Sequence, residues 1–217
     1  MKAISSFQKI LLAFYAFIGL LIVARMVYTG SSLYLFLVWN IFLAWIPCMI
    51  SGVLKRTTGQ AKWKSALLFF CWLAFFPNAL YIVTDLVHID LETTVPKWFD
   101  ALLLFSAAVL GLMLAFISLY RVEAFFSNSI SSRFRAPLLV LILFLGSFGV
   151  YLGRFLRWNS WDIVSNPVDL LLSIGHRIVF PLEHMGTWAI TLTFTIFFYL
   201  LYISIKKLPG YISQAIK

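Results

Sequence analysis

Charged residues are scarce in this chain, and their scarcity excludes a soluble globular domain. Of its 217 residues 12% are charged and 62% are apolar, and the mean hydropathy is +0.96. Soluble domains carry charge on roughly a quarter of their residues. The 17 basic and 8 acidic side chains could not cover a soluble surface of this size. The composition therefore indicates a protein embedded in a membrane.

Cysteine is also nearly absent, and with it the motifs that depend on cysteine. The chain has two, Cys48 and Cys71, and neither has the spacing of a metal or redox motif. The sequence shows no convincing internal repeat and no low-complexity tract. The net charge of +9 does not indicate a nucleic-acid partner, because the cations lie beside apolar runs and form no basic patch on a soluble surface.

Six apolar runs are long enough to cross a hydrocarbon core of about 30 Å, which takes roughly 17–25 helical residues. Because backbone groups in lipid must bond within their own segment, these runs are predicted to be helices. We therefore expect residues 1–217 to form a single all-α transmembrane domain. The predicted spans are residues 10–28, 33–54, 66–87, 98–120, 137–156 and 186–205.

The first run follows Lys2 and Lys9, as the apolar region of a signal peptide would. Arg25 comes next, however, with no small-residue cleavage site, so we expect a retained first helix.

The charges sort by sign between the two sides of the six-helix zigzag. Twelve of the 17 Lys and Arg residues fall on the side that holds both termini. By the positive-inside rule, both termini are predicted to be cytoplasmic. Seven of the 8 acids and all three histidines fall on the opposite, outer side. Since insertion does not require that placement of the acids, the outer polar residues are the candidates for function.

The first outer stretch ends the third span. Pro77 lies inside the span, where proline removes a backbone donor, so we expect a kink. If the helix resumes, Asn78, Tyr81, Asp85 and His88 share one stripe at 3.6 residues per turn. A polar stripe of this kind is expected to line a bundle interior or a wet cleft instead of facing lipid.

The second outer stretch ends the fifth span. Gly149 and Gly153 form a small-xxx-small face that lets another helix approach closely. Arg154 lies deep enough to pair with Asp85 or Asp100. Arg157 and the tryptophans that follow it also fit the simpler interpretation of a snorkelling cation and interfacial anchors.

The last outer loop is predicted to contain a short interfacial or re-entrant helix at residues 167–180, over the mouth of the bundle. Asn166 offers an N-cap, Pro167 fits the first helical position, and the following residues are amphipathic. His176 and His184, which lie in this loop, are more often surface histidines than ligands.

These stretches resemble a family of bacterial multi-pass membrane proteins catalogued as domain of unknown function 1361. The resemblance runs from about the second span onward, and its most specific part is the string at residues 153–162. The chain departs from the family at Leu80, where the family commonly has a second proline. The absence of that proline softens the expected kink. The resemblance implies a bacterial plasma-membrane location and brings no established activity or cofactor. The residues that carry it are Pro77-Asn78-Ala79-x-Tyr81, Thr84-Asp85-Leu86-x-His88, Trp98-x-Asp100 and Gly153-Arg154-Phe155-Leu156-Arg157-Trp158-Asn159-Ser160-Trp161-Asp162.

Three functions remain open from the sequence. The first is binding or modification of an anionic lipid-linked or amphiphilic substrate at the outer leaflet. Guanidinium groups would hold its phosphate or carboxylate, and a carboxylate–histidine pair would transfer protons. The second is a structural or accessory subunit whose polar cluster packs helices and meets a membrane protein partner. The third is transport of a small solute, although the six spans show no repeated half.

The candidate residues for the first function divide by role. The acid–base candidates are Asp85, His88 and Asp162, and the substrate-binding candidates are Asn78, Tyr81, Asp100, Arg154, Arg157, Trp158, Asn159 and Ser160. A metal variant would draw on His88, Asp90, His176 and His184, with Asp85 as a further ligand. Their spacing matches no dedicated zinc motif, and the cofactor is left open.

The predicted topology is tested by reporter fusions. Fusions at Gly59 and after Lys217 are expected to report a cytoplasmic location, and a fusion near Ser165 an external one, because of the distribution of Lys and Arg. The opposite pattern would move the candidate site to the cytoplasmic face.

Overall fold

The computed structural model describes residues 6–56, 62–90, 95–127 and 130–215, and within these ranges the chain forms helices and no strand. Six of the helices are long and apolar enough to cross a membrane. The predicted all-α class is confirmed, and the six apolar helices indicate a membrane-embedded protein. In chain order the elements are α1 (Ser6–Thr29), α2 (Phe36–Arg56), α3 (Lys62–Tyr81), the 3-10 helix η1 (Ile82–Asp90), α4 (Lys97–Phe126), α5 (Ser132–Leu156), α6 (Asp162–Ser165), α7 (Pro167–Val179) and α8 (Met185–Ala215).

Each long helix contains most of the corresponding predicted span, and the largest difference is in α8. This helix continues to Ala215, whereas the predicted span ends at Ile205. The apolar run ends where Lys206 and Lys207 begin, but lysine is a good helix former. The length of an apolar run therefore limits what can enter hydrocarbon and does not mark the end of the helix.

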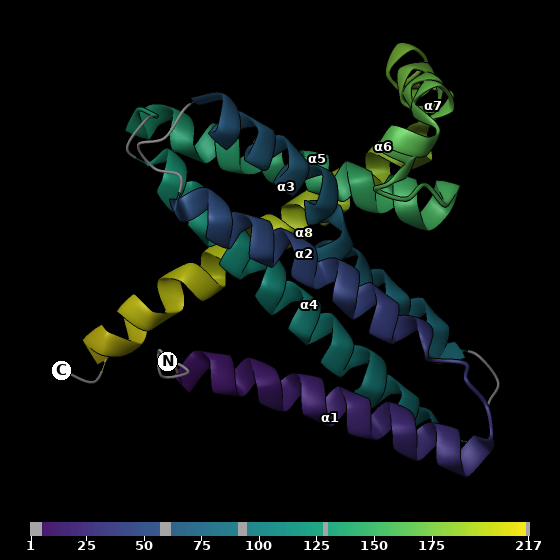
Figure 1. The fold of residues 1–217 in the computed structure, drawn as a ribbon. Helices are drawn as coiled ribbons and strands as arrows, with labels where there is room; N and C mark the ends of the chain where they lie inside the picture. Colours follow the sequence, from purple (N-terminus) through teal and green to yellow (C-terminus); the bar gives the residue numbers. More distant parts are fainter. Residues whose placement is uncertain (1–5, 57–61, 91–94, 128–129, 216–217) are drawn as a thin grey trace.

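Helix α4 is the centre of the bundle. In its most apolar stretch of 18 residues, two-thirds (67%) of the residues are buried, against 39% or less in the corresponding stretches of the other five long helices. Small residues such as Ala107, Gly111 and Ala115 let neighbouring backbones approach. A Cβ on Gly111 would lie 2.9 Å from the Ala79 carbonyl oxygen of α3. Figure 1 shows α1 running beside α4, with α2 and α3 on the other side and α8 behind.

Helices α3 and α5 meet along the predicted small-residue face. A Cβ on Gly149 would lie 2.4 Å from Cγ of Pro77, and one on Gly153 would lie 3.4 Å from the Tyr81 ring. Gly146 continues this face against Phe76. The close-contact role of Gly149 and Gly153 is therefore confirmed, with α3 as the partner helix.

The change in helix geometry comes later than the predicted kink at Pro77. Helix α3 stays α-helical through Tyr81, and the 3-10 geometry of η1 begins at Ile82. The β-branched residues of this segment are poor α-helix formers, and the Thr84 hydroxyl donates to the Tyr81 carbonyl at 2.6 Å. At 3.0 residues per turn Asp85 and His88 fall on one face. The predicted polar stripe thus survives, although not as a continuous α-helix.

Helix α7 begins as predicted and projects from the bundle (Figure 1). Asn166 occupies the N-cap position, but its side-chain amide donates to Asp169 at 2.9 Å and does not cap the helix. Leu170 is its one buried residue. Its apolar side is exposed at Val168, Leu171, Leu172, Ile178 and Val179.

The tight contact between α3 and α5 gives a stability prediction. Gly149→Ala forces a methyl group into Pro77, and overpacking of this kind is expected to cost about 1–3 kcal/mol. Gly19→Ala is the matched control, because a Cβ there meets nothing within 4 Å. Thermal unfolding of the detergent-purified variants measures both changes. Equal stability of the two variants would contradict the close contact.

Candidate functional site

Two buried ion pairs lie at the end of the bundle where α1, α3 and α5 end, which we call the site end. In the first, Arg25 Nε and Nη2 donate to the Asp100 carboxylate at 2.7 and 3.1 Å, and both side chains are 3% exposed or less. The Tyr34 ring lies 4.4 Å below the guanidinium, and its hydroxyl donates to the His88 carbonyl at 3.1 Å. Burial, aided by the negative charge of Asp100, raises the pKa of Tyr34 to about 12. The ion pair joins α1 to α4, and Tyr34 links it to η1.

The second pair joins η1 to α5 and α2. Asp85 is 1% exposed, and Arg154 Nη1 lies 3.3 Å from its Oδ1. The other carboxylate oxygen accepts a hydrogen bond from Asn40 Nδ2 at 2.8 Å. Both oxygens of Asp85 are therefore engaged by side chains from two other helices.

Arg154 is the centre of this second cluster. Besides Asp85, its guanidinium donates to the Tyr81 hydroxyl at 3.1 Å and to the Thr84 carbonyl at 2.8 Å. Nη2 also lies 3.3 Å from His88 Nε2. Because a guanidinium only donates, that nitrogen acts as an acceptor, which requires a neutral imidazole protonated at Nδ1. The sequence left Asp85 and Asp100 open as partners of Arg154, and the structure pairs it with Asp85.

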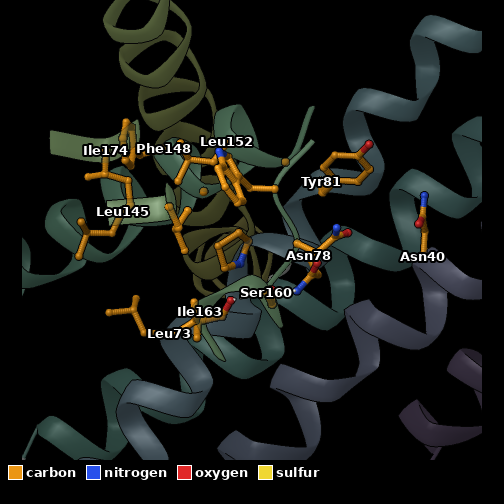
Figure 2. A pocket seen from close by; sticks show the side chains of 17 residues that line it. Asn40, Leu73, Asn78, Tyr81, Leu145, Phe148, Leu152, Ser160, Ile163 and Ile174 are labelled. Carbon is orange, nitrogen blue, oxygen red and sulfur yellow. Dashed lines mark hydrogen bonds between the residues drawn. The ribbon is translucent and has the colours of Figure 1, made fainter. Parts of the chain in front are cut away.

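Two adjoining hollows open beside this cluster. The polar hollow, of about 590 Å³, is lined by Tyr81, Val87, His88, Gly153, Arg154, Arg157 and Asn159. The second is a mainly apolar cavity of about 280 Å³ between α3 and α5 (Figure 2). Tyr81, Gly153 and Asn159 line both, so the two hollows are neighbours. The apolar walls of the second cavity include Leu73, Leu145, Phe148, Leu152, Leu170 and Ile174.

The segment after α5 forms one wall of the cavity and is fixed by hydrogen bonds. Asn78 donates to the Ser160 hydroxyl at 2.8 Å, and that hydroxyl donates to the Ala74 carbonyl at 3.0 Å. Figure 2 shows Asn78 and Ser160 side by side at the edge of the cavity. Trp158 reaches Ser173 of α7 at 3.4 Å. These bonds tie α3, the segment and α7 together around the cavity.

Arg157 differs from the other cations of this site. It is exposed, it follows the last residue of α5, and its φ of 60° places it in the left-handed region. Glycine is the usual residue there, and any other residue costs roughly 1–2 kcal/mol. Among the residues that the structure describes, its side chain has neither a hydrogen-bond nor an ion-pair partner. An arginine in a strained conformation whose side chain has no such partner among the described residues is a candidate for ligand binding.

Asp162 lies outside both hollows. Its carboxylate accepts the Asn159 backbone N–H at 2.7 Å and the Ser165 hydroxyl at 3.0 Å. The bond from the Asn159 backbone, with those from Ser165 and the Asn159 amide, holds the pKa of Asp162 below its usual range. This geometry closes the turn before α6 and gives the carboxylate a local structural role.

The predicted residues thus separate into three groups. The first group consists of acids with structural partners: Asp85 pairs with Arg154, Asp100 pairs with Arg25, and Asp162 holds a turn. The side chain of Asp90 lies outside the described residues. Those that line the two hollows are Asn78, Tyr81, His88, Arg154, Arg157, Trp158, Asn159 and Ser160.

Sequence reasoning missed two residues of the buried clusters. In the sequence, Arg25 indicates only that the first span is retained, and its position gives no sign of a buried partner. Asn40 was overlooked, although an amide in the middle of an apolar run is a signal for an internal partner.

The fold and these hollows define the class of protein: a multi-pass α-helical membrane protein with a polar site at one end of its helix bundle. Residues 39–201 match the family described as a protein of unknown function (DUF1361), and the chain belongs to that family, as the sequence indicated. No curated protein and no solved structure matched the chain.

The buried pair at Asp85 gives a second stability prediction. Asp85→Asn leaves Arg154 without its counter-charge and is expected to cost about 3–5 kcal/mol. Glu123→Gln is the control, because its pair with Lys206 is 24–36% exposed and such pairs contribute about 1 kcal/mol or less. Unfolding in detergent and folded yield measure the difference. A loss for Asp85→Asn no larger than for the control would show that the pair is not structural.

Proposed function

We propose that this protein binds an anionic amphiphile at the site end, with a phosphate or carboxylate head group in the polar hollow. The observation that carries the proposal is the position of Arg157. Its exposed guanidinium has no partner among the described side chains, and it lines a hollow that adjoins an apolar cavity. The distribution of Lys and Arg supports an outer-leaflet location for this end, and the proposed membrane is the plasma membrane.

The charges of the polar hollow favour an anion. Asp85 balances Arg154, whereas Arg157 has no acidic partner among the described residues, so the described lining of the hollow carries a net positive charge. A guanidinium binds phosphate or carboxylate through two parallel hydrogen bonds. Asn159 and Tyr81 line the boundary between the two hollows, where polar side chains orient a bound head group.

The apolar cavity favours an amphiphile over a small hydrophilic anion. Aliphatic and aromatic side chains from α3, α5 and α7 form most of its wall. A volume of about 280 Å³ accommodates a ring or a short part of a lipid chain. The Trp158 ring lies at the polar edge, where an interfacial tryptophan is energetically favourable.

The geometry supports binding more directly than acid–base catalysis. An Asp85–His88 pair was one sequence hypothesis, but Arg154 contacts both residues and lies between them. Asp85 lines neither hollow, and its two oxygens are already engaged. His88 lines the polar hollow, so it contributes to recognition of the ligand.

A structural or accessory role is the second candidate, and the two buried ion pairs favour it. They join α1 to α4 and join η1 to α5 and α2, as a helix-packing network would. The two candidates differ at Arg157, which takes part in neither pair. For transport, within the described helices only the α3–η1 junction changes helix type, and this gives no pair of broken helices.

Arg157→Gly separates ligand binding from stability. Glycine accepts the left-handed conformation, so stability is expected to stay equal or rise by up to about 1–2 kcal/mol. Loss of the guanidinium is expected to reduce co-purified anionic lipid at least about tenfold, since a charge-assisted contact contributes roughly 1.5–3 kcal/mol. Lipid mass spectrometry of the detergent-purified protein measures this.

Lys97→Ala is the matched control, because it removes one exposed positive charge outside the two hollows. It is expected to leave the bound lipid unchanged. Equal lipid retention by Arg157→Gly, or wild-type protein that retains no anionic lipid selectively, would refute the proposed function.

A further inference from the structure

A second group of polar side chains lies at the junction of α7 and α8, away from the two hollows. His176, Glu183 and His184 each place one potential ligand atom so that all three atoms lie within 4.8 Å of one another. His176 Nδ1 is 2.7 Å from His184 Nε2. His88 is not part of this group, because Arg154 engages it.

The local chain geometry builds this group from residues eight positions apart. Helix α7 ends as the Phe180 N–H bonds to the His176 carbonyl at 2.9 Å. The N–H groups of Glu183 and His184 then bond back to the carbonyls of Phe180 and Pro181, both at 3.2 Å. These turns return the chain toward the last turn of α7. The Phe180 ring also packs 4.9 Å from the His176 ring and helps to hold it.

We propose that His176, Glu183 and His184 bind a divalent transition metal ion, with zinc as the best fit. Two imidazole nitrogens and one carboxylate oxygen are a ligand set that zinc accepts, with water in the fourth position. Calcium and magnesium prefer oxygen ligands alone. The set differs from the one that the sequence suggested, since Glu183 takes the place of His88 and Asp90.

The distances are compatible with a tetrahedral ion. Zinc bonds of about 2.0–2.2 Å place ligand atoms roughly 3.3–3.5 Å apart. The two histidine nitrogens must separate slightly from 2.7 Å, and the Glu183 oxygen must move closer from at most 4.8 Å. His176 and Glu183 are exposed, so rotation of their side chains suffices and the backbone stays in place.

The metal ion links the end of α7 to the start of α8. Apart from the buried Leu170, most of α7 is exposed or half-buried, and its bond to Trp158 is long at 3.4 Å. Leu170 and Ile174 of this helix line the apolar cavity. A bound metal therefore fixes the helix that forms one wall of the cavity, whatever ligand the cavity holds.

The test uses tag-free, chelator-stripped full-length protein in detergent. Isothermal titration with Zn²⁺ is expected to show one saturable site per chain, and Co²⁺ to give the visible absorption of a tetrahedral nitrogen–oxygen site. His176→Gln, His184→Gln and Glu183→Gln should each raise the Kd for Zn²⁺ at least about tenfold. Asp169→Asn is the control, because Asp169 is an exposed carboxylate of α7 outside this group, and it should leave the Kd unchanged.

Each contrary result overturns the assignment independently of lipid binding. Wild-type protein without a stoichiometric Zn²⁺ site does so even if a variant fails to fold. A Zn²⁺ site that survives all three Gln substitutions also overturns the assignment. A site lost in His88→Gln but kept in His176→Gln would place the metal in the polar hollow instead.

Discussion

The pairing of buried guanidinium and carboxylate groups is the constraint on which the site end depends. An isolated charge inside an apolar bundle is costly, so each must meet an opposite charge and hydrogen-bonding groups. Asp85 meets Arg154 and Asn40, and Asp100 meets Arg25. These contacts bring η1, α5 and α2 together on one side and α1 and α4 on the other. The hollows lie beside the Asp85–Arg154 network at the end of the bundle.

Close backbone approach makes that pairing achievable. Gly149 contacts Pro77 directly, and Gly153 contacts the Tyr81 ring. Arg154 follows immediately, so its guanidinium reaches across a narrow gap to the carbonyl of Thr84. A larger side chain at the glycine positions would separate the helices and lengthen every one of these contacts. The glycine face and the buried pair therefore act together, since small residues set the distance that the charges need.

The sequence predicted the spans and most of the polar residues that line the hollows, because both depend on local pattern. Apolar run length determines which segments can cross a membrane, and the polar residues that interrupt the runs must face a cavity or each other. It could not predict which helices are neighbours, so the Arg25–Asp100 pair was missed. Nor could residue spacing show that the turn after Phe180 returns Glu183 to His176. The change to 3-10 geometry at Ile82 could not be predicted from the polar stripe either. Over so short a segment, an α-helix and a 3-10 helix place nearly the same residues on one face.

Three of the acids at the site end have a structural explanation, and this changes where function should be sought. Asp85 and Asp100 neutralise buried arginines, and Asp162 closes a turn. These three acids therefore serve the folded structure, and none of them lines either hollow. Among the described residues that line the polar hollow, the exposed charge is the cation Arg157, which is held in a strained conformation beside an apolar cavity. The acids outnumber the cations on the outer side of the sequence, yet the exposed charge that lines the polar hollow is positive and favours an anion.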